Sequence, residues 1–244
     1  MWRHTEVGGH ACAVYEPAQR NPHGYVVLYL HGVHQGSLED NPPFVAAFER
    51  HGLPVVCPAG KRSWWSDRIC PEFDAAISAE RHVLTNVLPF IESELGAAPP
   101  QIALLGTSMG GQGALRFSYK HPRLFPVVAA ISPAIDFHTR WDEGDEVLQS
   151  MYRDKEQVRQ ETALLYVNPL NWPRHQFFCC DPADTRWFDS ADRLAMKLNS
   201  MGIPHECDLT ATAGGHGFDY YNAMADTAVN FLAHRLDRER LRIV

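Results

Sequence analysis

The feature that most constrains the fold of this 244-residue chain is the alternation of short apolar runs with longer stretches of helical spacing. Each run is continuous rather than alternating in polarity, which is typical of strands covered on both faces of a parallel sheet. The stretches between them carry apolar residues at intervals of three and four, as helices that pack on a sheet do. The pattern predicts an α/β fold with a mostly parallel central sheet and helices on both faces. We expect strands at Tyr25–Leu30, Leu53–Cys57, Ile102–Leu105, Val127–Ile131 and Phe177–Cys180, and helices at Pro43–His51, Ala75–Leu95, Gly111–Lys120, Ser190–Met201 and Tyr220–Leu236.

The length fits one domain spanning residues 1–244, because an open α/β sheet with its helices uses up to about 250 residues. Thr5–Glu16 is expected to add an antiparallel hairpin at one edge of the sheet. Residues 138–175 contain no clean strand and many charges, and about 38 residues are too few to fold unaided. We therefore interpret 138–175 as a lid-like insertion that shapes a pocket, where changes at Trp141 or Tyr152 would alter substrate preference.

Charge and hydropathy exclude several classes of partner. With 22 basic and 29 acidic residues the net charge is −7, so a nucleic-acid partner is not expected. No apolar run approaches the roughly 20 residues of a membrane-spanning helix. The polar start, with Glu6 early, lacks the features of a secretory signal, and Cys57, Cys179 and Cys180 lie in apolar runs as buried reduced thiols would. We expect a cytoplasmic protein, and the sequence does not indicate its oligomeric state.

The sharpest chemical signal is the pentapeptide Gly106-Thr107-Ser108-Met109-Gly110. It follows an apolar run directly and precedes a helical stretch, which is the setting of a G-x-S-x-G nucleophile elbow. In such an elbow the serine sits at a sharp strand-to-helix turn and the glycines let neighbouring backbone approach closely. A glycine-rich turn with a capping serine is the alternative. The context favours Ser108 as a nucleophile.

An activated serine needs a base and a group that orients the base. In this topology the chain order is nucleophile, acid, histidine, and His216 lies in a glycine-rich loop just before the last predicted helix. The acid is expected after the strand that ends at Cys180, where both Asp181 and Asp184 are available. Asp184 lies further into the loop and is favoured, with Asp181 as a brace for the turn.

The same topology predicts two backbone donors for the oxyanion of a tetrahedral intermediate. One is the amide of Met109, and the second is the amide of Val33 in the loop His31-Gly32-Val33-His34. His31 and His34 have no third ligand at suitable spacing, so hydrogen-bonded loop histidines are expected rather than a metal site. The chain also lacks a complete phosphate-binding loop and a G-x-G-x-x-G turn, so no cofactor is predicted. Candidate pocket aromatics, each with core packing as the alternative, are Trp64, Trp65 and Trp187.

The stretch GTSMGGQGALRFSYKHPRLFPVVAAISPAIDF resembles the nucleophile region of the "putative esterase" group of the α/β-hydrolase superfamily. That group includes S-formylglutathione hydrolase (esterase D), feruloyl and acetyl-xylan esterases, and mycolyltransferases. The resemblance extends to YLHGVH, SWWSDRICPEF, the CDPADTRWFDS region and GGHGFDYYNAM, and so covers most of the chain. It implies the α/β-hydrolase fold and assigns the acid to Asp184, whereas Asp181 stands where the group commonly has glycine. The loop HGVHQG departs from S-formylglutathione hydrolase, so that thioesterase is not predicted.

These features predict a serine carboxylesterase that acts on a small or medium-sized ester through an acyl-enzyme. Two alternatives remain open at this point. An acyltransferase would use the same Ser108, His216 and Asp184 with an alcohol in place of water. A catalytically silent binding module would keep the fold without the chemistry, although all three residue types stand in their expected order.

Overall fold

A single eight-stranded sheet forms the centre of the computed structural model, which describes residues 1–242. The strand order is β1-β2-β4-β3-β5-β6-β7-β8, and β1–β2 and β2–β4 are antiparallel while all other pairs are parallel. The strands are β1 (Trp2–Val7), β2 (His10–Tyr15), β3 (Val26–Leu30), β4 (Val55–Pro58), β5 (Ile102–Thr107), β6 (Val127–Ile131), β7 (His175–Cys179) and β8 (Glu206–Asp208). The predicted parallel sheet and its antiparallel edge hairpin are confirmed.

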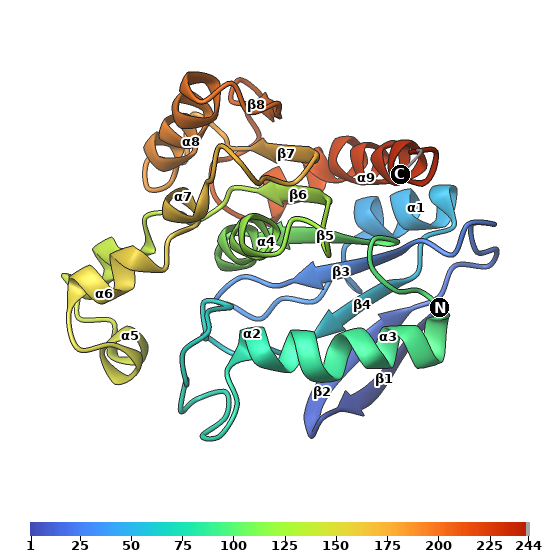
Figure 1. Cartoon of the computed structure of the whole chain (residues 1–244), viewed down its shortest axis with the longest axis horizontal. Coiled ribbons are helices and arrows are strands. Elements are labelled where there is room, and N and C mark those ends of the chain that lie inside the picture. Colours follow the sequence, from blue (N-terminus) through green and yellow to red (C-terminus); the bar gives the residue numbers. More distant parts are fainter. Residues whose placement is uncertain (243–244) are drawn as a thin grey trace.

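Helices cover both faces of the sheet, and each face has its own apolar core. Along β3, Val26, Leu28 and Leu30 face one core, and Val27 and Tyr29 face the other, as the alternation of strand side chains requires. Figure 1 shows α1 and α9 side by side over one face, opposite α2 and α3. The main helices are α1 (Pro42–His51), α2 (Ala79–His82), η1 (Val83–Val87), α3 (Leu88–Leu95), α4 (Met109–Lys120), α8 (Phe188–Ser200) and α9 (Phe218–Arg240).

The sequence prediction differs from the structure mainly at the ends of elements. The helix expected from Ala75 begins at Ala79 instead, because the side chain of Ser78 accepts a hydrogen bond from the amide of Arg81 and caps it. The same helix widens into the π-helical turn η1 just before Pro89, which has no N–H to donate. Strand β8 was not predicted, since its three residues are polar and largely exposed. No helix within residues 1–242 is long and apolar enough to span a membrane.

The insertion between β6 and β7 consists of short helices, which lie beside the sheet at the left of Figure 1. They are η2 (Phe137–Trp141), α5 (Glu146–Met151), α6 (Lys155–Gln160) and α7 (Ala163–Tyr166). Asp145 and Asp154 cap α5 and α6 through their side chains. The insertion adds Val147, Leu148 and Val158 to the core that α4 also lines, so it is packed onto the domain.

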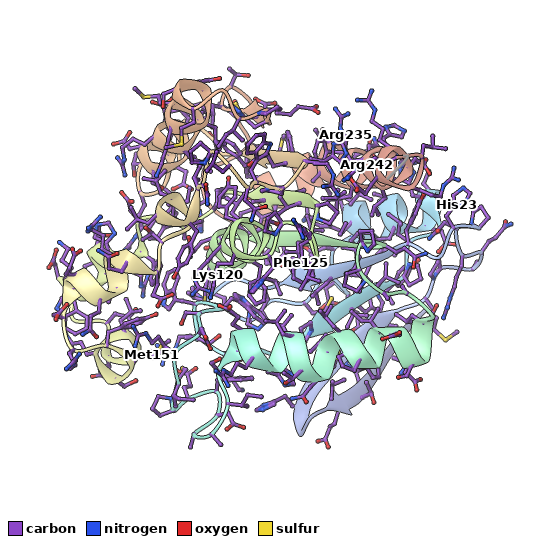
Figure 2. The ribbon with its side chains drawn as sticks, viewed as in Figure 1. His23, Lys120, Phe125, Met151, Arg235 and Arg242 are labelled. Atoms are coloured by element: carbon purple, nitrogen blue, oxygen red, sulfur yellow. The ribbon has the colours of Figure 1, made fainter. Side chains whose placement is uncertain are left out.

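A buried charge cluster fastens the insertion to helix α4. The fully buried guanidinium of Arg116 pairs with Glu80 of α2 and with Glu161 of the insertion. Lys120, labelled in Figure 2, extends the cluster at the end of α4, where its Nζ pairs with Glu80 and lies over the ring of Tyr166. Burial raises the pKa of the Glu80 carboxyl, but a hydrogen bond with His121 and the attraction of Arg116 and Lys120 outweigh it and bring the pKa to about 2.

Replacing Arg116 by methionine is expected to lower the free energy of unfolding by about 3–5 kcal/mol, because two buried carboxylates lose their shared partner. Urea denaturation of the Arg116→Met variant measures this loss. The control is Arg159→Met, which removes an exposed arginine paired with Glu156 and should leave the midpoint unchanged. An Arg116→Met midpoint equal to that of the control would contradict the expectation.

Candidate active site

Ser108 sits between β5 and α4 in a strained backbone conformation, with φ of 55° and ψ of −120°. The turn is held on both sides, because the Ser108 amide donates to the Ile131 carbonyl (3.0 Å) and the Ser108 carbonyl accepts from Ala134 (3.0 Å). A Cβ on Gly106 would overlap the Gly110 carbonyl, and one on Gly110 would overlap that of Leu30. The glycines of the pentapeptide are therefore required for the close approach of β3, β5 and α4.

His216 and Asp184 come from two loops at the carboxyl edge of the sheet and meet Ser108 there. Nε2 of His216 lies 2.9 Å from Oγ of Ser108, and Nδ1 lies 2.7 Å from Oδ2 of Asp184. The Asp184 carboxylate is buried, and its Oδ1 accepts from the amides of Arg186 (3.3 Å) and Trp187 (3.2 Å). These contacts orient the imidazole with Nδ1 as donor and Nε2 as acceptor, as a general base requires.

Asp181, the alternative acid, makes no hydrogen bond with His216 and instead braces the loop that carries His216. Its Oδ2 accepts from the amides of Ala213 (2.7 Å) and Gly215 (2.9 Å), and its Oδ1 accepts from Ala183 (2.7 Å). Burial raises the pKa of this carboxyl, but the three backbone donors outweigh it and hold the pKa below its usual value. Asp181 thus ties the loop that carries His216 to the loop that carries Asp184.

Tyr221, in the first turn of α9, is a site residue that the sequence analysis missed. Its hydroxyl lies 2.9 Å from Nε2 of His216, the same nitrogen that lies 2.9 Å from Oγ of Ser108. The two rings meet edge to face, with centroids 5.6 Å apart and planes at 90°. The only sequence signal is the spacing from His216, and it does not distinguish Tyr221 from Tyr220, which points into the core.

The two amides predicted as oxyanion donors belong to Met109, the residue after Ser108, and to Val33, in the loop that packs against Ser108. Gly32 brings its loop against the serine, since a Cβ on Gly32 would lie 3.2 Å from Cβ of Ser108. Val33 follows Gly32 and lines the cavity, while Met109 begins helix α4. Within residues 1–242, neither the Val33 nor the Met109 amide donates a hydrogen bond to another protein group. Both N–H groups are therefore free to serve a ligand.

His31, a neutral imidazole, holds in place the loop of residues 31–34 that carries the Val33 amide. It lies 2.8 Å from the Gly32 carbonyl through Nδ1, and its Nε2 accepts from the Gly60 amide at 2.9 Å. Burial lowers the pKa of His31 to about 4. This geometry agrees with the hydrogen-bonded loop histidine that we expected. Among the residues described, no three His, Cys, Asp or Glu side chains gather in a way that could hold a metal ion.

Acidification is expected to destabilise the protein through His31. Its pKa is lower in the folded chain than in the unfolded chain, so the unfolded chain binds the proton first as the pH falls. The stabilisation is present above about pH 6.5 and is lost toward pH 4, by about 2–3 kcal/mol. Urea denaturation at about pH 7 and pH 4.5 should show a smaller difference for His31→Gln than for wild type. Exposed His234→Gln is the control, and equal pH dependence in all three proteins would contradict the prediction.

A cavity of about 470 Å³ opens over Ser108 and His216. Aromatic side chains in its lining are those of Trp64, Trp187, Phe218 and Tyr221. Two of the three predicted pocket tryptophans therefore line it, whereas Trp65 is buried beneath the loop and donates to the His31 carbonyl (3.1 Å). Trp64 stacks on Phe137 at the start of the insertion, with centroids 4.4 Å apart.

The insertion contributes Arg140 to the lining of the cavity, and not Trp141 or Tyr152 as we expected. Neither of those two is among the described residues that line the cavity, and Tyr152 is buried with its hydroxyl bonded to Ser66 (3.0 Å). Nε of Arg140 is bonded to the capping residue Asp145 at 2.7 Å. The ion pair between Arg186 and Glu143 links the loop after β7 to the insertion at the same end of the cavity.

The comparisons with known proteins agree with this architecture. Residues 10–231 match the family model described as "Putative esterase". The chain belongs to this family. Membership makes the esterase a serine hydrolase that acts on ester bonds. The curated proteins contain no match to it.

Solved structures show the α/β-hydrolase fold at low sequence identity. The esterase is similar to a ferulic acid esterase with 17% identity and a TM-score of 0.73, over 97% of this chain and 98% of that one. It is similar to an S-formylglutathione hydrolase from Agrobacterium tumefaciens (19%, 0.73, 97% and 94%). It is also similar to fluorophosphonate-binding serine hydrolase F of Staphylococcus aureus (14%, 0.74, 96% and 96%). The predicted fold is thereby confirmed.

Proposed function

We propose that Ser108, His216 and Asp184 form a catalytic triad that hydrolyses carboxylic esters through an acyl-enzyme. The observation that carries the proposal is the chain of short contacts from Asp184 through His216 to Ser108, of 2.7 and 2.9 Å. All three groups converge at the floor of one cavity on a strained elbow. The proposal needs neither a metal ion nor an organic cofactor.

In the acylation step, Nε2 of His216 takes the proton of Ser108 as Oγ attacks the ester carbonyl. Asp184 keeps the imidazole in the required tautomer and stabilises its protonated form. The negative charge that develops on the carbonyl oxygen is held by the amides of Val33 and Met109, whose N–H groups are free. The C–O bond of the ester then breaks, and the alcohol leaves with the proton from Nε2.

In the deacylation step, a water molecule attacks the acyl-enzyme while Nε2 accepts its proton, which regenerates Ser108. The cavity volume lies in the range usual for small-ligand sites, which supports a small or medium-sized substrate with apolar parts. We assign residues 138–175 to the roof of this pocket, within a single domain, with Arg140 as its substrate-facing residue. A cytoplasmic location stays a prediction, and the six free cysteines are compatible with it.

The silent binding module and the acyltransferase are less well supported than the esterase. The silent-module interpretation is disfavoured because the serine, histidine and carboxylate are already in hydrogen-bond contact. Acyl transfer would use the same residues, and the esterase family match favours water over an alcohol as the acceptor.

The test is hydrolysis of a panel of nitrophenyl and alkyl esters, combined with labelling by a fluorophosphonate that reacts with activated serines. We expect turnover of short and medium-chain esters and stoichiometric labelling. Repeating the reaction with added alcohols measures how much acyl group is transferred. A chain that is neither labelled nor active on any ester would support the silent module, and preferential transfer to alcohol in water would support the transferase.

A further inference from the structure

The hydroxyl of Tyr221 occupies a position that the triad mechanism leaves unexplained. With Nδ1 of His216 donating to Asp184, Nε2 has a single lone pair to offer. Two hydroxyls lie 2.9 Å from that nitrogen, Oγ of Ser108 and Oη of Tyr221. Only one can donate to it fully. The two hydroxyls therefore compete for the same lone pair.

The leaving oxygen of the ester also has to approach Nε2 of His216. Nε2 has to give its proton to that oxygen, which must therefore come within about 2.6–3.2 Å of the nitrogen. Oη of Tyr221 already lies within that distance of Nε2, and Tyr221 lines the same cavity. The leaving oxygen and the tyrosine hydroxyl are thus placed as neighbours around one ring nitrogen.

We propose, on the basis of the proposed esterase function, that Tyr221 is a further catalytic residue, whose hydroxyl donates a hydrogen bond to the leaving oxygen as the ester C–O bond breaks. The electron pair of that bond passes to the leaving oxygen, which receives the proton of Nε2. Tyr221 keeps its own proton throughout and stabilises the charge that develops before the transfer is complete.

The surroundings of Tyr221 support a role as a hydrogen-bond donor rather than an acid. The residue is 5% exposed, and burial raises the pKa of its phenol above the usual value although the nearby Ser108 side chain opposes this. The ring is held edge to face against His216 and against Phe218, with centroid distances of 5.6 and 5.2 Å. A hydroxyl fixed in this way is already oriented when the substrate binds.

The experiment compares two esters of the same acyl group in the Tyr221→Phe variant. An alkyl ester releases a basic alkoxide that needs stabilisation, whereas a 4-nitrophenyl ester releases an anion that is stable without it. We expect kcat/KM, which reports acylation, to fall by about 10–100-fold for the alkyl ester and by less than about 3-fold for the nitrophenyl ester. Tyr220→Phe, the same change one residue earlier and in the core, should leave both values at the wild-type level.

The outcomes separate this role from a structural one. If Tyr221 only positioned His216, its loss would slow both esters equally, because both require deprotonation of Ser108. An equal loss on the two esters, or no loss on either, would overturn the role of Tyr221 while leaving the esterase function intact. A wild-type protein that hydrolyses neither ester would overturn the proposed function and the role of Tyr221 together.

Discussion

Replacing Ser108 by alanine is expected to lower the rate of ester hydrolysis by at least about four orders of magnitude and to abolish fluorophosphonate labelling. Alanine removes the nucleophile, because the strained elbow presents Oγ of Ser108 at 2.9 Å from Nε2 of His216. Steady-state kinetics and gel fluorescence of the labelled protein measure the two effects.

The matched control is Ser118→Ala, which removes a buried serine near the carboxyl end of α4, the helix that follows the elbow. It should be labelled and active at the wild-type level. Thermal denaturation of both variants ensures that the loss is chemical and not caused by unfolding. Labelling of the Ser108→Ala variant at the wild-type rate would mean that another residue is the nucleophile.

Replacing Asp184 by asparagine is expected to lower kcat by about 10⁴-fold while KM changes little. An amide at this position can donate to Nδ1 of His216 and so favours the tautomer whose Nε2 carries the proton, which cannot accept the proton of Ser108. The buried carboxylate also no longer stabilises the imidazolium that forms during the reaction. Purified Asp184→Asn is assayed against wild type on a 4-nitrophenyl ester.

Asp181→Asn separates the two carboxylates that the sequence offered. The Asp181 carboxylate accepts hydrogen bonds from three backbone N–H groups and none from His216. The variant should therefore lose stability more than intrinsic activity. We expect a lower denaturation midpoint with kcat within about tenfold of wild type at a temperature where the variant is folded. The opposite ranking of the two variants in kcat would exchange their roles.

The parts of the site that were predictable from sequence depend on local chain geometry. The elbow of Ser108 can be recognised in the sequence because its flanking glycines, the preceding strand and the following helix are contiguous in the chain. Asp184 and His216 follow from chain order, since the carboxyl ends of parallel strands meet at one edge. The strands at 102–107 and 127–131 were predictable for a similar reason, as both are buried on two faces and continuously apolar.

The features that the sequence did not reveal depend on the direction in which a helix points a side chain, or on contacts with residues far away in the chain. The direction of Tyr221 is set by how α9 packs against α1 and the sheet, so its contact with His216 has no local signature. Trp141 and Tyr152 are large aromatics in the insertion, yet the residue that faces the cavity is Arg140, held there by Asp145. Strand β8 is recruited only because β7 offers it an edge, since its own residues are polar.

The Arg116 cluster has a consequence for how substrate enters and leaves. If the insertion swung away, Glu161 would separate from the Arg116 guanidinium. That guanidinium is wholly buried, so its charge would lose a partner with no water to replace it. Gln112, four residues earlier on the same helix, also holds the insertion at both ends of its amide, through Glu161 (3.2 Å) and Ala163 (2.8 Å). Residues 161–163 of the insertion are therefore fastened to α4. We therefore expect that opening of the insertion does not set the turnover time of ester hydrolysis.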